Sequence, residues 1–443
     1  MQINEEVYIF RSMDKELLIW KNETHRKPLL IRGARQVGKS TAIRHFSRHF
    51  KYYVEVNFEQ KKEIGELFNT SLDPKQICSK LSVIYGIPII PGQTLVFFDE
   101  IQSCIPAISS LRYFYEDYSD LHIVATGSLL EFALQELPSF GVGRIRTMFM
   151  YPFSFDEFLN AQGESLLIEE KKHATTKPPF PEVFHNKLND YLKIFMITGG
   201  MPEVVKTYTS TKDLNKCQAI LQDLTLTLTD DFAKYKKRFS PVILSKVFQI
   251  VAKSTGAKFI YASISENIKI HQVKEALELL TNAGIIIPVT HTSANGIPLG
   301  AETNEKLRKF ILFDNGIQQS LLGLSMGDIF LSSDFTGVNK GCIAETFAGI
   351  ELVKYNSCYQ RTPLYYWQRE ERTGNAEVDY VIQRKNTILP IEIKAGTKGS
   401  MQSIQYFMSK KEISKGVRCS LENFGQISNI EIIPLYALSN LYI

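Results

Sequence analysis

The chain has 443 residues, 44% of them hydrophobic and 22% charged, with 51 Lys and Arg against 47 Asp and Glu and a formal net charge of +4. This composition excludes a collagen-like, coiled-coil or wholly disordered protein, and the charge is too small to indicate nucleic-acid binding by itself. At roughly 100–200 residues per domain, the length predicts two to four domains.

The cysteines and the apolar segments bear on the cellular environment. The six cysteines are scattered and form no C-x-x-C pair, so we expect neither a zinc knuckle nor a disulfide framework. The start, MQINEEVYIF, lacks the apolar segment of a secretory signal, and no apolar run approaches the ~18 residues of a membrane helix. We therefore expect a cytoplasmic protein without membrane insertion.

The first motif is a glycine-rich loop between a short apolar strand at residues 27–32 and a helical segment from Thr41 to about Phe50. Its pattern, G-x-x-x-x-G-K-[ST], is that of a phosphate-binding loop. Glycines let backbone amides point at one anion, and the helix N-terminus favours negative charge. The sequence thus predicts an ATP site that extends to Thr41 and is formed by Gly33, Ala34, Arg35, Gln36, Val37, Gly38, Lys39 and Ser40.

The polar side chains of this loop and of the next strand have predicted roles. Lys39 can reach the β- and γ-phosphates, and the Ser40 hydroxyl can ligate Mg²⁺. A buried strand at residues 94–98 ends in Asp99 and Glu100, at the edge where α/β sheets bind ligands. We expect Asp99 to hold Mg²⁺ through water and Glu100 to orient or activate the attacking water. An ordinary solvated acid pair is the alternative.

Two further segments follow in the same region. A strand at residues 121–125 precedes Thr126-Gly127-Ser128, which either contacts the γ-phosphate or forms a simple strand-to-helix turn. Arg144 precedes the apolar stretch 148–155, and we expect it to stabilise charge on the transferring phosphate, in its own chain or in a neighbouring copy. A solvated surface arginine is the alternative.

The middle of the chain is predicted to be helical, with one variable segment. Residues 161–190 are polar and rich in proline, which favours a loop or an insertion. The pattern from 188 to 229 is helical and is broken by Gly199-Gly200-Met201-Pro202, for which we favour a role in domain packing.

Residues 241–313 suggest a winged helix. Helices are expected at 241–254 and 271–282, strands at 259–261, 285–289 and 309–313, and a hairpin turn at Asn295-Gly296. The exposed face of the second helix carries Lys274, Glu275 and Glu278, which opposes DNA reading, so we favour domain coupling or protein contact. The best local basic patch, with a solvated face as its alternative, is Lys234, Lys236, Lys237 and Arg238.

A hairpin near the C-terminus gathers charged residues. A two-residue turn at Lys385-Asn386 places Asp379 opposite Glu392, and the strand period of two puts Glu392 and Lys394 on one face. Two carboxylates suit Mg²⁺ or Mn²⁺, and Lys394 can position a water or stabilise phosphate charge. A surface hairpin with paired charges is the alternative.

Two resemblances extend this interpretation. With IRGARQVGKST, LVFFDEIQ, ATGSLL, VGRIRTMFMYPFSFDEFL, GGMPEVV and DDFAKY, the chain resembles a family of prokaryotic AAA-type P-loop ATPases, related to the signal-transduction ATPases with numerous domains. The resemblance runs from about Tyr8 to the end and implies ATP and Mg²⁺ binding, hydrolysis, and a C-terminal domain of unknown function. That C-terminal region is similar to the PD-(D/E)XK nuclease fold, which implies Glu345 as a further acid from the preceding helix.

The expected fold class is α/β with four parts. They are a P-loop core with a parallel sheet at 1–160, a helical extension at 161–240, a winged-helix-like domain at 241–313 and a nuclease-like domain at 314–443. The first hypothesis is an ATP-dependent molecular switch. The alternatives are an ATP-gated nuclease acting on DNA or RNA and a scaffold with an inactive nuclease fold.

The charge balance and the possible partners qualify these hypotheses. Residues 314–443 carry 13 basic and 13 acidic residues, so this region has no net charge. A nuclease usually has a basic surface, which here can come only from a local patch. The partners we consider are a protein, a nucleic acid and a second copy of the chain. The candidate patch is Lys410, Lys411, Lys415 and Arg418.

Overall fold

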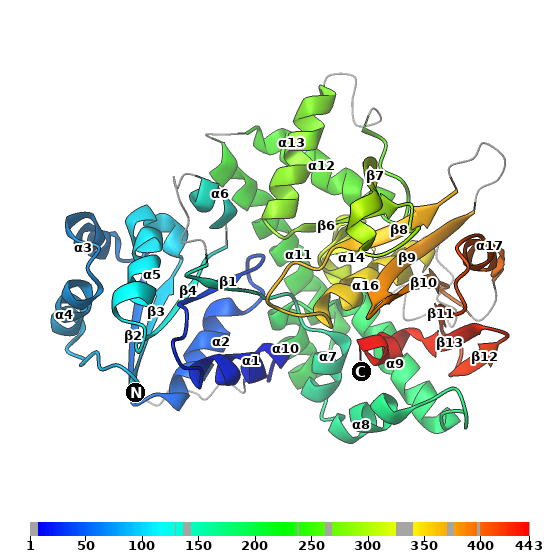
Figure 1. Ribbon diagram of the computed structural model, residues 1–443, viewed down its shortest axis with the longest axis horizontal. Coiled ribbons are helices and arrows are strands. Elements are labelled where there is room, and N and C mark those ends of the chain that lie inside the picture. Colours follow the sequence, from blue (N-terminus) through cyan, green and yellow to red (C-terminus); the bar gives the residue numbers. More distant parts are fainter. Residues whose placement is uncertain are drawn as a thin grey trace. The chain divides into compact units, whose positions relative to one another are not determined.

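The computed structural model describes residues 8–128, 130–135, 143–236, 239–261, 268–324, 340–369, 376–396 and 399–442. The chain divides into two compact units. Unit 1 comprises Met1–Tyr151 and Ser357–Arg361, and unit 2 comprises Pro152–Asn356 and Thr362–Ile443. The four-part division given above stays a prediction. Figure 1 labels the elements of both units.

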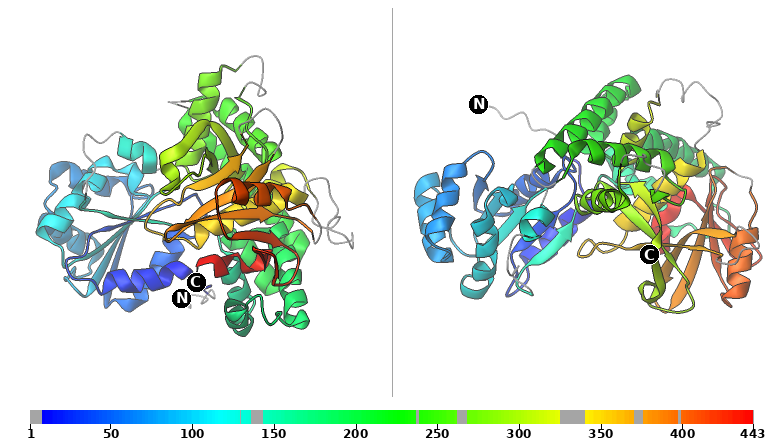
Figure 2. Two further views of the ribbon diagram at one scale, coloured as in Figure 1. Left: turned by 45° about the vertical axis from the view of Figure 1, so that its right-hand side comes forward. Right: turned by 90° about the horizontal axis from the view of Figure 1, so that it is seen from above.

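Unit 1 is built on a parallel five-stranded sheet in the order β2-β3-β4-β1-β5, which agrees with the predicted P-loop core. Helices cover both of its faces (Figures 1 and 2). Its strands are β1 Leu29–Arg32, β2 Tyr52–Asn57, β3 Thr94–Asp99, β4 His122–Thr126 and β5 Arg146–Phe149. Its helices are α1 Ser12–Lys21, α2 Lys39–Phe46, α3 Gly65–Thr70, α4 Pro74–Tyr85, α5 Ile105–Asp117 and α6 Leu130–Gln135.

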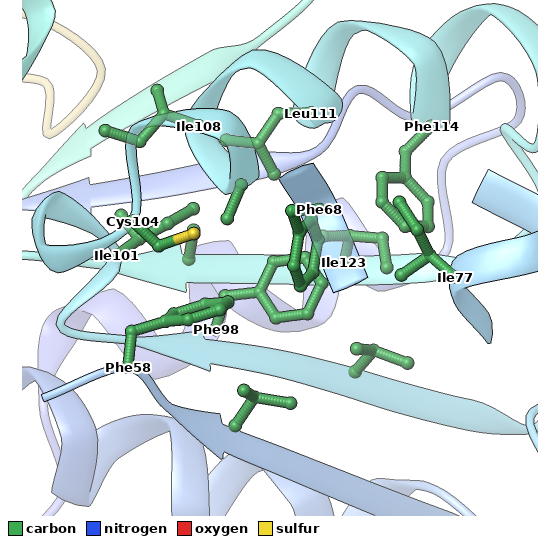
Figure 3. Packing of buried hydrophobic residues seen from close by; sticks show 14 of the residues in the cluster. Phe58, Phe68, Ile77, Phe98, Ile101, Cys104, Ile108, Leu111, Phe114 and Ile123 are labelled. Atoms are coloured by element: carbon green, nitrogen blue, oxygen red, sulfur yellow. The ribbon is translucent and has the colours of Figure 1, made fainter. Parts of the chain in front are cut away.

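Aromatic packing anchors the strand that ends in Asp99. Every residue of β3 is buried, which accounts for its apolar run between Thr94 and Asp99. On one face of the sheet, the rings of Phe58, Phe68 and Phe98 meet edge to face with centroids 5.4–5.6 Å apart (Figure 3). Helices α3, α4 and α5 cover this face. The packed rings hold β3 in place and so fix the position of Asp99 at its end.

A short segment from the C-terminal third of the chain belongs to unit 1. The backbone amide of Phe149, at the end of β5, donates a hydrogen bond of 2.7 Å to the carbonyl of Cys358. The hydroxyl of Tyr359 donates to Glu16 at 2.8 Å, and the guanidinium of Arg361 lies 5.4 Å from the ring centre of Phe149. Residues 357–361 are therefore tied to the edge of the sheet by backbone and side-chain contacts.

Unit 2 begins with helices, and further helices follow between its strands. They are α7 Phe155–Ala161, α8 Ser165–His173, α9 Glu182–Thr198, α10 Pro202–Thr211, α11 Leu214–Asp230, α12 Pro241–Ser254, α13 Ile270–Asn282, α14 Asn315–Leu321, α16 Lys340–Lys354 and α17 Gln402–Lys410. The predicted loop at 161–190 was wrong in large part, because α8 and the start of α9 lie there. Buried Leu167, Ile168 and Lys171 give α8 an inner face that its polar composition concealed.

The second sheet has eight strands in the order β12-β13-β11-β10-β9-β8-β6-β7. Its strands are β6 Ile286–Thr292, β7 Thr303–Leu312, β8 Leu364–Gln368, β9 Glu377–Arg384, β10 Thr387–Ile393, β11 Gly416–Ser420, β12 Gly425–Ile427 and β13 Ile430–Pro434. Strands β8, β9 and β10 are antiparallel neighbours, and β11 follows α17 and runs parallel to β10.

The strands predicted for the winged helix join this larger sheet. Strand β6 pairs with β7 on one side and runs parallel to β8 on the other. Residues 259–261 are not a strand: Phe259 donates one backbone hydrogen bond to Arg308, and η6 Leu299–Glu302 lies in the β6–β7 connection beyond Asn295-Gly296. The hairpin therefore extends the C-terminal sheet across the predicted boundary at residue 313.

The Gly199-Gly200 pair has a packing explanation within unit 2. Gly199 adopts φ 70° and ψ −170°, and a Cβ there would lie 2.2 Å from Oδ1 of Asp314. The amide of Gly200 donates to Oδ2 of the buried Asp314 at 2.7 Å, while Oδ1 caps α14 by accepting from Ile317 at 3.1 Å. One carboxylate thus joins the α9–α10 turn to the start of α14. Gly199 leaves room for this carboxylate, and Gly200 leaves room for the backbone of Phe153.

Candidate functional site

The phosphate-binding loop lies between β1 and α2, where the sequence predicts it. Gly38 has φ 96° and Gln36 has φ 61°, so the loop uses left-handed backbone angles immediately before the helix. A Cβ on Gly33 would lie 2.1 Å from the carbonyl oxygen of Met150, which follows β5. Only glycine permits this close approach of two backbones, so the first glycine of the motif serves packing of the loop against β5.

Lys39, the lysine of the motif, is buried at the start of α2. Its ammonium donates to the carbonyl oxygens of Gly33 at 2.9 Å and Ala34 at 2.7 Å. Burial lowers the pKa of Lys39 to about 8, against the opposing effect of the carboxylates of Glu100 and Asp99. The loop therefore holds its lysine inward on its own carbonyls, close to the two acids.

Asp99 is the point at which four elements converge. Its Oδ1 accepts hydrogen bonds from the hydroxyls of Ser40 at 2.9 Å and Thr126 at 2.5 Å. Its Oδ2 accepts from the side-chain amide of Asn57 at 3.2 Å, and the guanidinium of Arg44 lies 3.8 Å away. The structure thus joins the P-loop hydroxyl to the acid at the end of β3, and a carboxylate beside a hydroxyl is a donor set that Mg²⁺ accepts.

Sequence reasoning did not single out Asn57. It ends β2, the strand that pairs with β3, and the two strands are in register at Asn57 and Asp99. Because parallel strands end at one edge of a sheet, an amide at the end of a neighbouring strand was a usable signal. This signal could not be used because the sequence does not specify which strands are neighbours in the sheet.

Glu100 follows Asp99 in a left-handed conformation, with φ 50°. Its Oε2 accepts from the Gln102 side chain at 2.5 Å and from the Ser128 hydroxyl at 3.5 Å. Ser128 in turn accepts from Nε of Arg35 at 3.2 Å. Glu100 is therefore held between Gln102 and the end of β4, next to the P-loop, in a place suited to orienting a water.

Arg144 lies on the short segment before β5 and forms an ion pair with Glu116 of α5. Its side chain is half-exposed. The predicted role of Arg144 in phosphate chemistry stays a prediction, and it would require the arginine to exchange this partner.

In unit 2, strands β9 and β10 pair in the predicted register. Thr387 lies opposite Arg384 and Ile391 opposite Tyr380, with Lys385 in the turn at φ 52°. Asp379 therefore lies level with Glu392, and its Oδ2 accepts from the backbone amide of Ile393 at 2.7 Å. Lys394 donates to Oε1 of Glu392 at 2.6 Å.

Four acids interact here, and we call them the carboxylate cluster: Glu345 on α16, Glu377 and Asp379 on β9, and Glu392 on β10. Burial raises the pKa of Glu345, Asp379 and Glu392. The pKa of Glu392 rises to about 7, and the negative charge of Asp379 is the second cause of that rise. Among the described residues, the buried Oε2 of Glu392 has no hydrogen-bond partner. Burial and neighbouring negative charge disfavour ionisation of Glu345, Asp379 and Glu392.

The described parts of the chain bear on the metal site, on membrane helices and on the two basic patches. Within them, no group of three His, Cys, Asp or Glu side chains is placed to hold a metal ion, and no helix is long and apolar enough to cross a membrane. In the candidate C-terminal patch, Lys415 pairs with Glu431 at 2.8 Å and buried Arg418 with Glu422 at 3.3 Å. Lys237 and Arg238 of the other patch lie outside the described residues.

Three family models match the chain. Residues 25–159 match a family described as an AAA domain. Residues 189–328 match a domain of unknown function (DUF8612), and residues 340–438 match another (DUF4143). The N-terminal segment is thus an AAA-type P-loop domain, as predicted, and the C-terminal part belongs to domains without a known function. A comparison with curated proteins gives no match.

Solved structures resemble the chain only distantly. The Orc1 protein of Aeropyrum pernix in complex with DNA has 11% identity and a TM-score of 0.31, over 73% of this chain and 95% of its own. PCH-2 of C. elegans has 11% identity and a TM-score of 0.28, over 46% and 63%. Drosophila ORC bound to DNA has 14% identity and a TM-score of 0.27, over 70% and 94%.

Proposed function

Because residues 25–159 are an AAA-type P-loop domain, we propose that this chain is an ATP-hydrolysing molecular switch whose unit 1 binds Mg²⁺-ATP. The observation that carries the proposal is the 2.9 Å hydrogen bond from the Ser40 hydroxyl to Asp99. It brings the phosphate-binding motif and the acid strand, found separately in the sequence, to one point. Bound Mg²⁺ would supply charge neutralisation for the phosphates there.

Different residues in and beside the loop serve ATP binding and ATP hydrolysis. The amides of Gly33–Ser40 and the N-terminus of α2 bind the phosphates. Lys39 exchanges the carbonyls of Gly33 and Ala34 for phosphate oxygens, while Ser40 and Asp99 would hold the metal ion. Glu100, held by Gln102, orients the attacking water and takes its proton.

The chain path supports a switch. Met150 touches Gly33 of the loop, and the chain enters unit 2 two residues later, at Pro152. It returns to unit 1 at Ser357 and leaves again after Arg361, between α16 and β8 of unit 2. The chain thus passes between the two units at three points. A structural change at the phosphate site can be transmitted along these connections to unit 2, where α16 carries Glu345.

The test is ATP turnover of the full chain. We expect Lys39→Ala to lose ATP binding and Glu100→Gln to bind ATP but turn over about 10²-fold more slowly, the usual effect of losing a general base. Lys75→Ala and Glu63→Gln, both at exposed positions of unit 1, are the matched controls and should behave as wild type. A wild type that neither binds nor hydrolyses Mg²⁺-ATP would refute the proposal.

A second candidate function is metal-dependent nucleic-acid cleavage by unit 2. Two features support it: β8, β9 and β10 pair antiparallel while β11 pairs parallel with β10, and Asp379 lies level with Glu392. The buried Oε2 of Glu392, without a hydrogen-bond partner, is the observation that favours chemistry over a structural hairpin.

Cleavage is tested by incubating the chain with supercoiled plasmid, single-stranded DNA or RNA in Mg²⁺ or Mn²⁺, with and without ATP. We expect Asp379→Asn to abolish any cleavage, while Asp190→Asn, at an exposed site of unit 2, should not. Cleavage that persists unchanged in Asp379→Asn would come from a contaminant and would sink this candidate. Normal ATP turnover without cleavage would favour the inactive scaffold.

A further inference from the structure

The carboxylate cluster faces a lysine that the sequence did not suggest. Lys309 lies on β7, far from β9 and β10 in sequence, and its side chain is only 3% exposed. Its ammonium forms an ion pair with Glu377, and it interacts electrostatically with Glu345 and Asp379 as well. The same ammonium lies 5.0 Å from the ring centre of Tyr366 on β8.

Burying the charged ammonium of Lys309 has a high free-energy cost. An ammonium taken out of water costs several kcal/mol unless nearby charges and hydrogen bonds compensate it. Three carboxylates supply that compensation. In return, the ammonium removes much of the repulsion between the neighbouring acids, so that the cation and the cluster stabilise each other.

The cluster is also closed on the side of Glu345. Gly256, which follows α12, adopts φ 80°, and a Cβ there would lie 2.8 Å from Oε2 of Glu345. Cys342, one turn before Glu345, donates through its thiol to the carbonyl of Thr255. The turn after α12 thus packs against Glu345, while β7, further along the chain, contributes the Lys309 ammonium.

We propose that the ammonium of Lys309 is the resident cation of the carboxylate cluster, so that the cluster takes no divalent metal ion while β7 holds this lysine in place. This inference rests on the second candidate function and adds a condition to it. Metal-dependent cleavage would require Lys309 to withdraw, which makes β7 and the cover at Gly256 the parts that control the site.

An ammonium and a divalent ion require different arrangements of carboxylate oxygens. A divalent ion would draw Glu345, Asp379 and Glu392 to within about 2.0–2.6 Å of one point. The arrangement around Lys309 has one direct ion pair and several longer interactions instead.

The experiment measures metal binding rather than cleavage, so that it can fail independently of the nuclease. Titration calorimetry with Mn²⁺ alone is performed on the wild-type chain, Lys309→Met and the control Lys306→Met, an exposed lysine on the same strand. Any Mn²⁺ held at the P-loop is common to all three. We expect Lys309→Met to gain one binding site at least about tenfold tighter than anything in the other two, and a raised melting temperature in Mn²⁺.

A second pair of variants covers the case in which Lys309→Met does not fold. Lys309→Met/Glu377→Gln removes one negative charge together with the positive one, so it should melt at a higher temperature than Lys309→Met. Adding Asp379→Asn to Lys309→Met should abolish the gained Mn²⁺ site. The proposal is overturned if wild type and Lys309→Met bind Mn²⁺ equally at a site that Asp379→Asn removes from both. It is also overturned if the Glu377→Gln change gives no rescue.

Discussion

Replacing Gly199 by alanine should destabilise unit 2 by several kcal/mol. Gly199 has φ 70° and ψ −170°, a region used almost only by glycine, and forcing another residue into it costs about 1–3 kcal/mol. The added Cβ would also lie 2.2 Å from Oδ1 of Asp314 and 2.6 Å from the amide of Gly316. The side chain of Asp314 must then move.

The second contribution comes from that movement. The buried carboxylate of Asp314 accepts from the amides of Gly200 and Ile317. A hydrogen bond to a charged group contributes about 1.5–3 kcal/mol, so losing the one from Gly200 brings the total to about 3–6 kcal/mol. At about 2 °C per kcal/mol for a unit of this size, the melting temperature should fall by about 6–12 °C.

Scanning calorimetry of the full chain measures this, with Gly163→Ala as the matched control. Gly163 also belongs to unit 2 and has φ 83°, but a Cβ there meets nothing within 4 Å. We expect only the left-handed backbone cost, about 1–2 kcal/mol, for the control. Equal melting temperatures for the two variants would refute the reasoning about Asp314. ATP binding should be unchanged in both, since neither residue belongs to unit 1.

Three other outcomes are expected. Burial lowers the pKa of Lys39 to about 8, and a bound phosphate must raise it again. Above pH 8 the protein therefore takes up a proton when ATP binds, so its affinity for ATP falls as the pH rises from 8 to 10. Calorimetry at pH 9 in two buffers of different ionisation enthalpy detects the uptake, and its absence would contradict the assignment. Asn57→Ala removes a partner of Asp99 and should raise the KM for Mg²⁺-ATP about tenfold, with ATP affinity in EDTA unchanged; equal losses in both would point to a folding defect. Since the folded-state pKa of Glu392 is raised to about 7 from 4.5, stability is lost as pH rises through that interval, by up to about 3 kcal/mol. Asp379→Asn should flatten this loss in urea unfolding between pH 5 and 8, and an unchanged slope would exclude Asp379 as a cause.

Local patterns predicted much of both candidate sites. The P-loop is a contiguous motif, and the buried run before Asp99 can only be a core strand, so both could be placed without knowledge of the fold. The level position of Asp379 and Glu392 also followed from local geometry, because a two-residue turn fixes the register of a hairpin. The loop predicted at residues 165–173 is a helix instead, because its three buried side chains stabilise the helix although the segment is polar overall.

The sequence by itself determined the P-loop core, the pairing of β9 with β10, and helices α12 and α13, since each depends on neighbours within a few residues. The tertiary structure alone decided which distant side chains share a site. The strand order brought Asn57 to Asp99, the extended sheet brought Lys309 to Glu377, and the fold of unit 2 placed Asp314 beneath Gly199. These contacts join residues 42, 68 and 115 positions apart, and no periodicity extends over such distances. They arise because burying apolar faces fixes how elements pack, and the polar groups left between the elements must then satisfy one another.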